Sequence, residues 1–109
     1  MLTIVELSPF HKNAANYLTD GELEIFKDHI SRNPVEGAVI QGTGGIRKMR
    51  WAVKGKGKSG GVRVIYYFYN VSIPLFLITI YGKSDKSSLS PSERNAMKQL
   101  TALLKRYGD

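Results

Sequence analysis

Seven basic residues and no acidic residue lie between Gly45 and Arg63. They are Arg47, Lys48, Arg50, Lys54, Lys56, Lys58 and Arg63. Like charges this close together repel one another, which costs stability unless a polyanion neutralises them. A basic run is most often a solvated loop. Here the charges alternate with apolar and aromatic strand residues, which would hold them in fixed directions. This pattern favours a surface that binds nucleic acid.

A set of cations can also promote cleavage of RNA without a metal, because RNA carries its own nucleophile in the 2′-hydroxyl. The protein has only to orient that hydroxyl and stabilise the charge that develops on the phosphate. Arginine does this with a bidentate fork and lysine as a point charge, and a lysine crowded by other cations can act as a base nearer neutral pH. Tyr66, Tyr67 and Tyr69 can stack a base, although core packing is the commoner role on a central strand.

The glycine-rich part of the segment resembles phosphate-binding motifs but lacks their context. Gly55-x-Gly57-x-x-Gly60 matches the dinucleotide fingerprint as a string. That motif needs a helix N-terminus directed at the pyrophosphate, and the residues that follow read as a strand. Gly57-Lys58-Ser59 resembles the end of a P-loop, but Ala52 stands where the first glycine is required. The glycines therefore predict a tight hairpin loop.

No other residue type suggests a catalytic or metal centre. No pair of carboxylates lies beside the basic segment in sequence, which argues against a two-metal nuclease. His11 and His29 are remote from the cations, so helix positions are favoured over a ribonuclease-type pair. The chain has no cysteine, which excludes disulfides and thiolate sites and suits a reducing cytoplasm. No metal and no cofactor is expected.

The length and composition predict one soluble domain over residues 1–109. The chain is 42% hydrophobic and 23% charged, and its net charge is +7. No apolar stretch approaches the roughly 20 residues of a membrane helix, and the N-terminus lacks the features of a signal peptide. A cytoplasmic protein that makes no membrane contact is therefore expected.

The N-terminal third predicts a strand and a helical hairpin. Residues 3–7 are rich in β-branched side chains. Ser8-Pro9 is typical of a helix start, with the hydroxyl as cap and proline at the first helical position. Thr19 and Glu22 form the pattern of a capping box, so a second helix is expected to reach about Arg32.

The remainder predicts an antiparallel meander followed by a helix. Residues 46–53, 62–69 and 75–81 read as strands joined by hairpin connections. The middle run is apolar on both faces, which indicates a central strand. Ser90, Pro91 and Glu93 predict the start of a last helix that ends near Tyr107. The expected fold is a small α+β domain of order β-α-α-β-β-β-α, with an antiparallel sheet, an N-terminal helical hairpin and a C-terminal helix.

Three segments carry a family resemblance that extends over the whole chain. Residues 42–50 read GTGGIRKMR, residues 55–68 read GKGKSGGVRVIYYF, and residues 78–83 read ITIYGK. With these blocks the chain resembles the RelE/HigB superfamily of bacterial type II toxins, most closely its HigB-like branch. The resemblance implies a RelE-like fold and a toxin that enters the A site of the 30S ribosomal subunit, against 16S rRNA, and cleaves mRNA there. It also implies a cognate antitoxin, HigA-like and often with a helix-turn-helix domain.

The resemblance also implies roles for individual residues. Lys54, Lys56 and Arg63 reproduce the RelE-type spacing of two lysines and an arginine: the lysines would act as base or phosphate contact, and Arg63 would stabilise the transition-state charge. The best-studied branch has an arginine after the Gly-Lys that ends the last strand. This chain has Ser84 there, so Lys83 or Lys86 is expected to substitute, and the general base stays open. The expected catalytic set is Lys54, Lys56, Arg63 and Lys83, and the expected RNA-binding set is Arg47, Lys48, Arg50, Lys58, Tyr67 and Lys86.

Two other functions remain as alternatives. ParE-like toxins share the fold and block DNA gyrase by protein contact, but they lack the basic catalytic set that Lys54, Lys56 and Arg63 reproduce. A non-catalytic RNA-binding module would also use a basic hairpin, and in that case substitution of Arg63 would change affinity alone.

Overall fold

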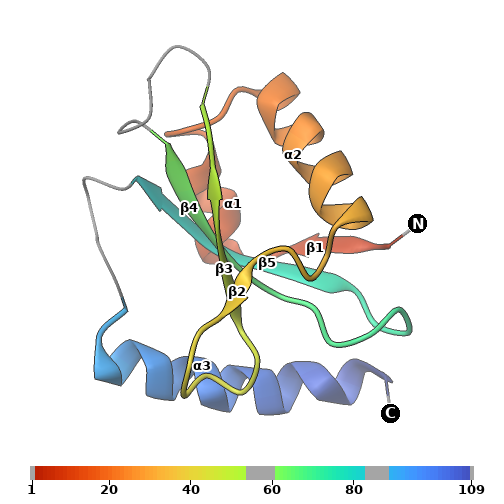
Figure 1. The fold of residues 1–109 in the computed structure, drawn as a ribbon, viewed down its shortest axis with the longest axis vertical. Helices are drawn as coiled ribbons and strands as arrows, with labels where there is room; N and C mark the ends of the chain where they lie inside the picture. Colours follow the sequence, from red (N-terminus) through yellow and green to blue (C-terminus); the bar gives the residue numbers. More distant parts are fainter. Residues whose placement is uncertain (1, 54–60, 83–88, 109) are drawn as a thin grey trace.

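The structure, a computed structural model, describes residues 2–53, 61–82 and 89–108 (Figure 1). In chain order, the described elements are β1 (Ile4–Glu6), α1 (Ser8–Ala14), α2 (Asp20–Arg32), β2 (Ala38–Val39), β3 (Arg47–Trp51), β4 (Val62–Tyr67), β5 (Leu75–Gly82), α3 (Pro91–Leu104) and a terminal 3-10 turn (Lys105–Gly108). The expected α+β class is confirmed.

The strands form one sheet in the order β1-β5-β4-β3-β2, with β4 at its centre. Strands β2 to β5 are antiparallel neighbours, as the meander predicts, whereas β1 runs parallel to β5. The sheet is therefore mixed and not purely antiparallel. The expectation differed because β1 and β5 are far apart in sequence, so no turn fixes their relative direction. The two-residue β2 lies outside the strand segments that the sequence predicts.

Two of the three predicted helix starts have the expected caps. The Thr19 and Ser90 hydroxyls accept hydrogen bonds from the backbone N–H groups of Glu22 and Glu93, and each glutamate accepts one in return. The start of α1 differs, because the N-cap is Leu7 and no side chain caps it. Proline is tolerated there because an N–H in the first helical turn would have no helical partner.

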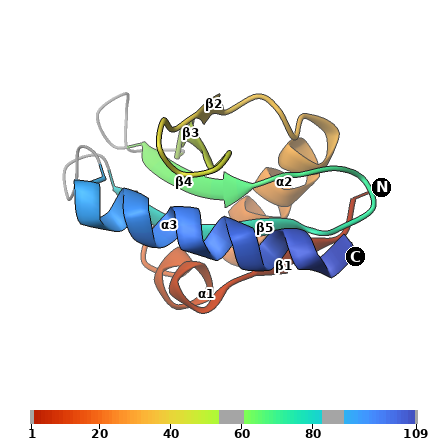
Figure 2. The same ribbon diagram turned by 90° about the horizontal axis from the view of Figure 1, so that it is seen from below.

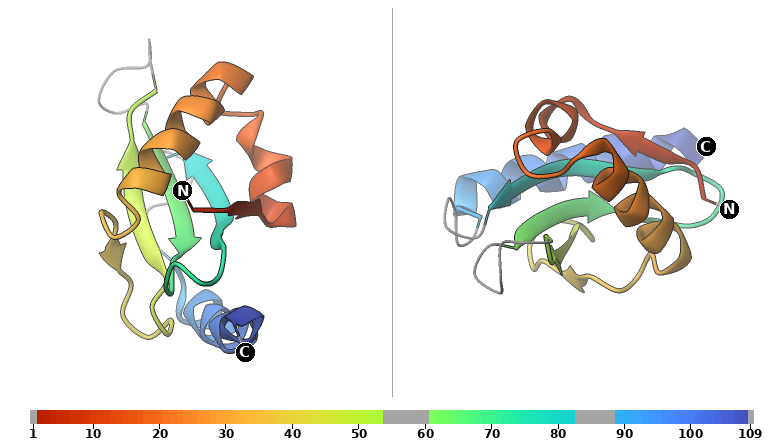
Figure 3. Two further views of the ribbon diagram at one scale, coloured as in Figure 1. Left: turned by 90° about the vertical axis from the view of Figure 1, so that its right-hand side faces the viewer. Right: turned by 90° about the horizontal axis from the view of Figure 1, so that it is seen from above.

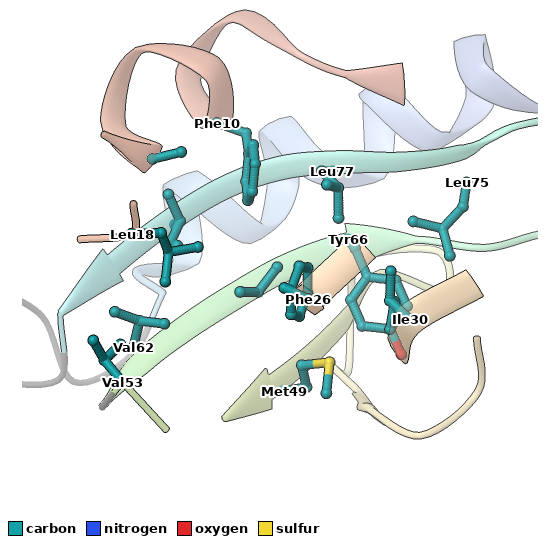
Figure 4. Close-up of a cluster of buried hydrophobic side chains, with 13 residues drawn as sticks. Phe10, Leu18, Phe26, Ile30, Met49, Val53, Val62, Tyr66, Leu75 and Leu77 are labelled. Atoms are coloured by element: carbon teal, nitrogen blue, oxygen red, sulfur yellow. The ribbon is translucent and has the colours of Figure 1, made fainter. Parts of the chain in front are cut away.

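The helical hairpin covers one face of the sheet, which we call the hairpin face. Figure 3 shows α2 crossing in front of the strands, on the side away from α3. Its core joins Phe10 of α1 and Phe26 and Ile30 of α2 to strand residues such as Val64 and Tyr66, all fully buried. Figure 4 shows part of this cluster, gathered from α1, α2 and the strands.

Helix α3 covers the other face, which we call the α3 face (Figure 2). Its core contains Ile65 and Tyr67 of β4, Phe76 and Ile78 of β5, and Leu104 of α3, among other side chains. All six residues of β4 are buried, because helices cover its apolar side chains on both faces. None of the helices in the described segments has the length and apolar character that a bilayer crossing requires.

The loop before β3 attaches the sheet to α3. Thr101 is 2% exposed, and its hydroxyl lies within hydrogen-bond distance of the carbonyls of Thr43 (3.2 Å) and Lys98 (2.8 Å). Gly44 lies against the same threonine with a φ of +79°, and a Cβ there would collide with the Thr101 hydroxyl. The GTGG segment therefore holds α3 against the sheet.

Candidate nucleic-acid interface

The pairing of β3 with β4 divides the basic residues between the two faces of the sheet. In this register Arg47 lies opposite Tyr66, Lys48 opposite Ile65, and Arg50 opposite Arg63. Side chains directly opposite each other point to the same face, and successive residues alternate. Lys48, Arg50 and Arg63 therefore share the α3 face, whereas Arg47 lies on the hairpin face.

Arg63 lies on the central strand and is 8% exposed. Its cross-strand neighbours are Arg50 on β3 and Tyr81 on β5. Within the described segments, neither Arg63 nor Arg50 has a carboxylate as an ion-pair partner. A buried cation without a counter-charge is costly, and a second cation directly opposite adds to the cost. The pair forms a site that an anion would stabilise.

Tyr81 is a member of this site that the sequence did not single out. It is 8% exposed and lies beside Arg63 in the register of β4 and β5. The predicted strand 75–81 contained the residue, but its neighbour on β4 depends on the register. That register shifts at an irregularity between Ile65 and Tyr66, which no local sequence pattern announces.

Arg47 does not belong to this site. Its Nη1 donates hydrogen bonds to the backbone carbonyls of Val35 (3.1 Å) and Gly37 (2.7 Å). The Tyr66 hydroxyl accepts from the Gly37 N–H (2.8 Å) and donates to the carbonyl of Pro34 (2.9 Å). These bonds attach the segment between α2 and β2 to the sheet. Arg47 therefore has a structural role that the sequence did not indicate, because folding alone brings residues 35–37 close to it. Its expected contact with RNA stays a prediction.

Tyr67 does not offer a surface for a base either. Tyr67 is 1% exposed and belongs to the core of the α3 face. Burial raises the pKa of its hydroxyl, and the neighbouring Tyr69 raises that pKa further. Burial also raises the pKa of Tyr66, against the hydrogen bond from Gly37 and the charge of Arg47. Tyr69, by contrast, is 52% exposed and stacks on Tyr67 with 6.4 Å between the ring centroids.

The ends of three strands meet next to Arg63. Val62 pairs with Trp51, which ends β3, and with Gly82, which ends β5. In sequence, these strand ends flank the segments that carry the other expected site residues. Lys54, Lys56, Lys58, Lys83 and Lys86 lie outside the described residues.

Charge is distributed unevenly along the chain. Residues 1–40 contain three Lys and Arg residues and six Asp and Glu residues, a net charge of −3, whereas residues 41–109 contain 13 and three, a net charge of +10. Every ion pair found among the described residues lies within residues 1–40. The cations of β3 and β4 therefore belong to the part of the sequence that is poor in carboxylates.

In the N-terminal part, by contrast, the Glu6 carboxylate is paired with a group of opposite charge. It is 2.6 Å from the Lys27 ammonium and 3.3 Å from His11. Burial alone would raise the pKa of Glu6, but the hydrogen bonds and charges of Lys27 and His11 outweigh it and lower that pKa below its ordinary value. The described segments contain no group of three His, Cys, Asp or Glu residues that could hold a metal ion.

A comparison with protein families identifies the chain. The model described as the RelE toxin of the RelE/RelB toxin–antitoxin system matches residues 10–109, nearly the whole sequence. The chain belongs to the RelE toxin family. This RelE-family protein is therefore a toxin of a toxin–antitoxin system, and a cognate antitoxin is its partner. The helices and the mixed sheet of the described segments form an α+β fold that is consistent with the RelE-like fold.

Proposed function

We propose that this RelE-family toxin is a ribosome-dependent messenger-RNA endonuclease of the HigB-like branch. The observation that carries the proposal is the position of Arg63, which is 8% exposed, lies opposite Arg50 and has no carboxylate partner among the described residues. A buried guanidinium that no described carboxylate pairs with is suited to bind a phosphate and to stabilise the negative charge that develops on it. ParE-like inhibition of gyrase by protein contact gives no reason for such a group.

In the proposed reaction the 2′-hydroxyl of the message attacks the neighbouring phosphorus. The new 2′-O–P bond forms as the P–O5′ bond breaks, giving a 2′,3′-cyclic phosphate and a 5′-hydroxyl. The 2′ proton passes to a base and the leaving 5′ oxygen gains a proton. Lys54 and Lys56 serve as base or phosphate contact, Arg63 stabilises the charge on the phosphoryl oxygens, and Lys83, which follows β5 in the sequence, supplies a further cation.

The remaining cations bind the RNA and do not take part in bond breaking. Lys48 and Arg50 share the α3 face with Arg63, and Lys58 and Lys86 belong to the neighbouring segments of the sequence. Phosphate contacts of this kind fix the register of the message and weaken as salt increases. In the cell the toxin would act in the 30S A site against 16S rRNA and be silenced by a HigA-like antitoxin with a helix-turn-helix domain.

Primer extension on a translated message tests this function. Purified ribosomes that hold a defined codon in the A site are mixed with the toxin, and the same message without ribosomes is the control. We expect cleavage within the A-site codon on the ribosome and a rate at least about 100-fold lower on free message, because positioning supplies much of the acceleration. An uncut ribosomal message, together with inhibition of DNA gyrase supercoiling, would overturn the proposal in favour of the ParE-like alternative.

A further inference from the structure

An exposed group of aromatic rings and cations lies at the opposite end of β4 from Arg63. The C-terminal end of α3 runs beside the turn between β4 and β5 in all the views (Figures 1, 2 and 3). There Tyr107 packs edge-on against Phe76, with 5.2 Å between the ring centroids, and Tyr69 stacks on Tyr67. Tyr67 and Phe76 are cross-strand neighbours, so four rings form one continuous cluster.

The outer rings of this cluster are open to solvent. Tyr69 is 52% exposed and Tyr107 is 68% exposed, whereas Tyr67 and Phe76 are each 1% exposed and hold the outer rings from beneath. Exposed tyrosine rings that pack on buried aromatic rings present flat surfaces on which unpaired nucleic-acid bases can stack.

Among the described residues, cations accompany these rings. The Lys105 ammonium lies 5.6 Å from the centre of the Tyr69 ring, and Arg106 follows it on the exposed terminal turn. Among described residues from 61 onward, the only acid is Glu93, whose carboxylate caps the distant N-terminus of α3. A cation beside a stacking ring can pair with the phosphate that flanks a stacked base. This charge pattern favours RNA over an apolar protein partner.

We propose that Tyr69, Tyr107, Lys105 and Arg106 form a second RNA-binding surface, which we call the distal patch, and that it binds unpaired bases of ribosomal RNA. Tyr69 is six residues beyond Arg63 along an extended chain, which places them about 20 Å apart. Groups around one phosphodiester cannot span that distance, so the distal patch contacts RNA other than the scissile link. The choice of ribosomal RNA rests on the proposed function.

Binding of a fluorescein-labelled oligoadenylate, followed by anisotropy, tests the distal patch without a ribosome or a reaction. The toxin carries Arg63→Ala throughout so that the oligonucleotide stays intact. We expect Tyr69→Ala and Tyr107→Ala each to weaken binding about fivefold or more, because stacking on one ring typically contributes about that much or more. Tyr69→Phe keeps the ring and should bind like the parent.

Matched controls distinguish the distal patch from general effects. Val71→Ala removes an exposed apolar side chain of the same turn, and Lys12→Ala removes a surface cation on α1; both should leave affinity unchanged, whereas Lys105→Ala should lower it. Thermal unfolding of each variant checks that it is folded. Unchanged oligoadenylate binding in folded Tyr69→Ala/Tyr107→Ala protein would overturn the proposal, and so would a loss confined to antitoxin binding.

Vacant ribosomes, which hold no message, identify the source of the RNA. If the distal patch binds ribosomal RNA, the double variant should cosediment with them several-fold less than the parent. Weakened oligoadenylate binding with unchanged affinity for vacant ribosomes would overturn the assignment to ribosomal RNA. Since oligoadenylate binding requires no cleavage, this proposal and the nuclease function can fail separately.

Discussion

The two faces of the sheet at β3 and β4 handle charge in opposite ways. On the hairpin face, Arg47 donates hydrogen bonds to backbone carbonyls. Ion pairs such as Glu6–Lys27, between β1 and α2, and Asp28–Arg32, on α2, lie among the elements on this side. On the α3 face, Arg50 and Arg63 lie opposite each other without a described carboxylate partner. In the first arrangement, hydrogen bonds and ion pairs within the fold hold the charged groups. In the second, no described carboxylate does so, and an anionic ligand could take that place.

This difference separates residues that serve stability from residues that serve binding. A buried cation that lacks a counter-charge is retained at a cost, and such costs concentrate at functional sites. Substitutions on the hairpin face should therefore lower stability and leave the chemistry of folded molecules intact. Substitutions of the cations Arg50 and Arg63 on the α3 face should impair the chemistry and leave stability equal or higher.

The largest effect is expected from Phe26→Ala on the hairpin face. Phe26 is fully buried and packs edge-on against Trp51, with 5.1 Å between the ring centroids. Its removal should lower the free energy of unfolding by about 3–5 kcal/mol, because it leaves a cavity in the core. Denaturant unfolding measures the loss. Ile25→Ala, at a neighbouring position that is 64% exposed, should change stability by less than about 0.5 kcal/mol.

Arg63→Met should produce the opposite result. We expect cleavage of ribosome-bound message to fall by about 10²- to 10³-fold, because a donor that stabilises transition-state charge is lost. The melting temperature should stay equal or rise, since a buried cation without a described carboxylate partner is replaced by an apolar side chain of similar length. Arg63→Lys keeps the positive charge but not the bidentate geometry of the guanidinium. Its cleavage rate should fall between those of the parent and of Arg63→Met. A melting temperature several degrees lower would place Arg63 among the structural residues.

A pH effect is expected at Glu6. The pKa of Glu6 is lower in the folded protein than in the unfolded chain, so the unfolded chain binds a proton more readily as pH falls. The stability that Glu6 contributes is therefore present above about pH 4.3 and is lost as pH falls through the folded pKa. Glu6→Gln should therefore cost about 1 kcal/mol at pH 7 and much less at pH 3. Thermal melts at both pH values measure this. Glu24→Gln removes a carboxylate that is 75% exposed and 3.9 Å from Lys27, and a cost as large as that of Glu6→Gln would contradict the assignment.

The smallest effect is expected from Arg50→Ala. Arg50 is exposed on the α3 face, so its loss should weaken RNA binding a few-fold and reduce the salt dependence by about one phosphate contact. Affinity measured at several salt concentrations gives both quantities. Arg32→Ala, whose guanidinium pairs with Asp28 on α2, is the matched control. If Arg50→Ala and Arg32→Ala changed RNA affinity and its salt dependence equally, the proposed difference in RNA binding between the two faces would be contradicted.

Much of the fold could be predicted because its signals are local. The capping patterns at Thr19 and Ser90 mark helix starts through contacts three residues apart, and the apolar run of β4 indicates a central strand. The parallel pairing of β1 with β5 could not be predicted, since it joins residues from opposite ends of the chain. The uncapped start of α1 shows that Ser-Pro permits a helix without fixing which residue is its N-cap.

The candidate site could be predicted only in part. Arg63 was assigned from its spacing to two lysines, and the structure places it opposite Arg50 on the α3 face. The roles of Arg47 and Tyr67 depend on which face of the sheet they occupy and what covers it, and neither is encoded by neighbouring residues. Tyr67 is buried and Tyr69 is 52% exposed, so Tyr69 is the tyrosine that a base can reach.

A single 2′-deoxyribose at the scissile nucleotide tests the central claim most directly. Ribosomes are programmed with two messages that differ only in that sugar, and single-turnover cleavage by the toxin is measured on each. If cations of the α3 face promote attack by the message's own hydroxyl, the ribose message is cut and the deoxyribose message stays intact at that link. Equal cleavage of both messages would contradict the account, because the nucleophile would then have to come from elsewhere.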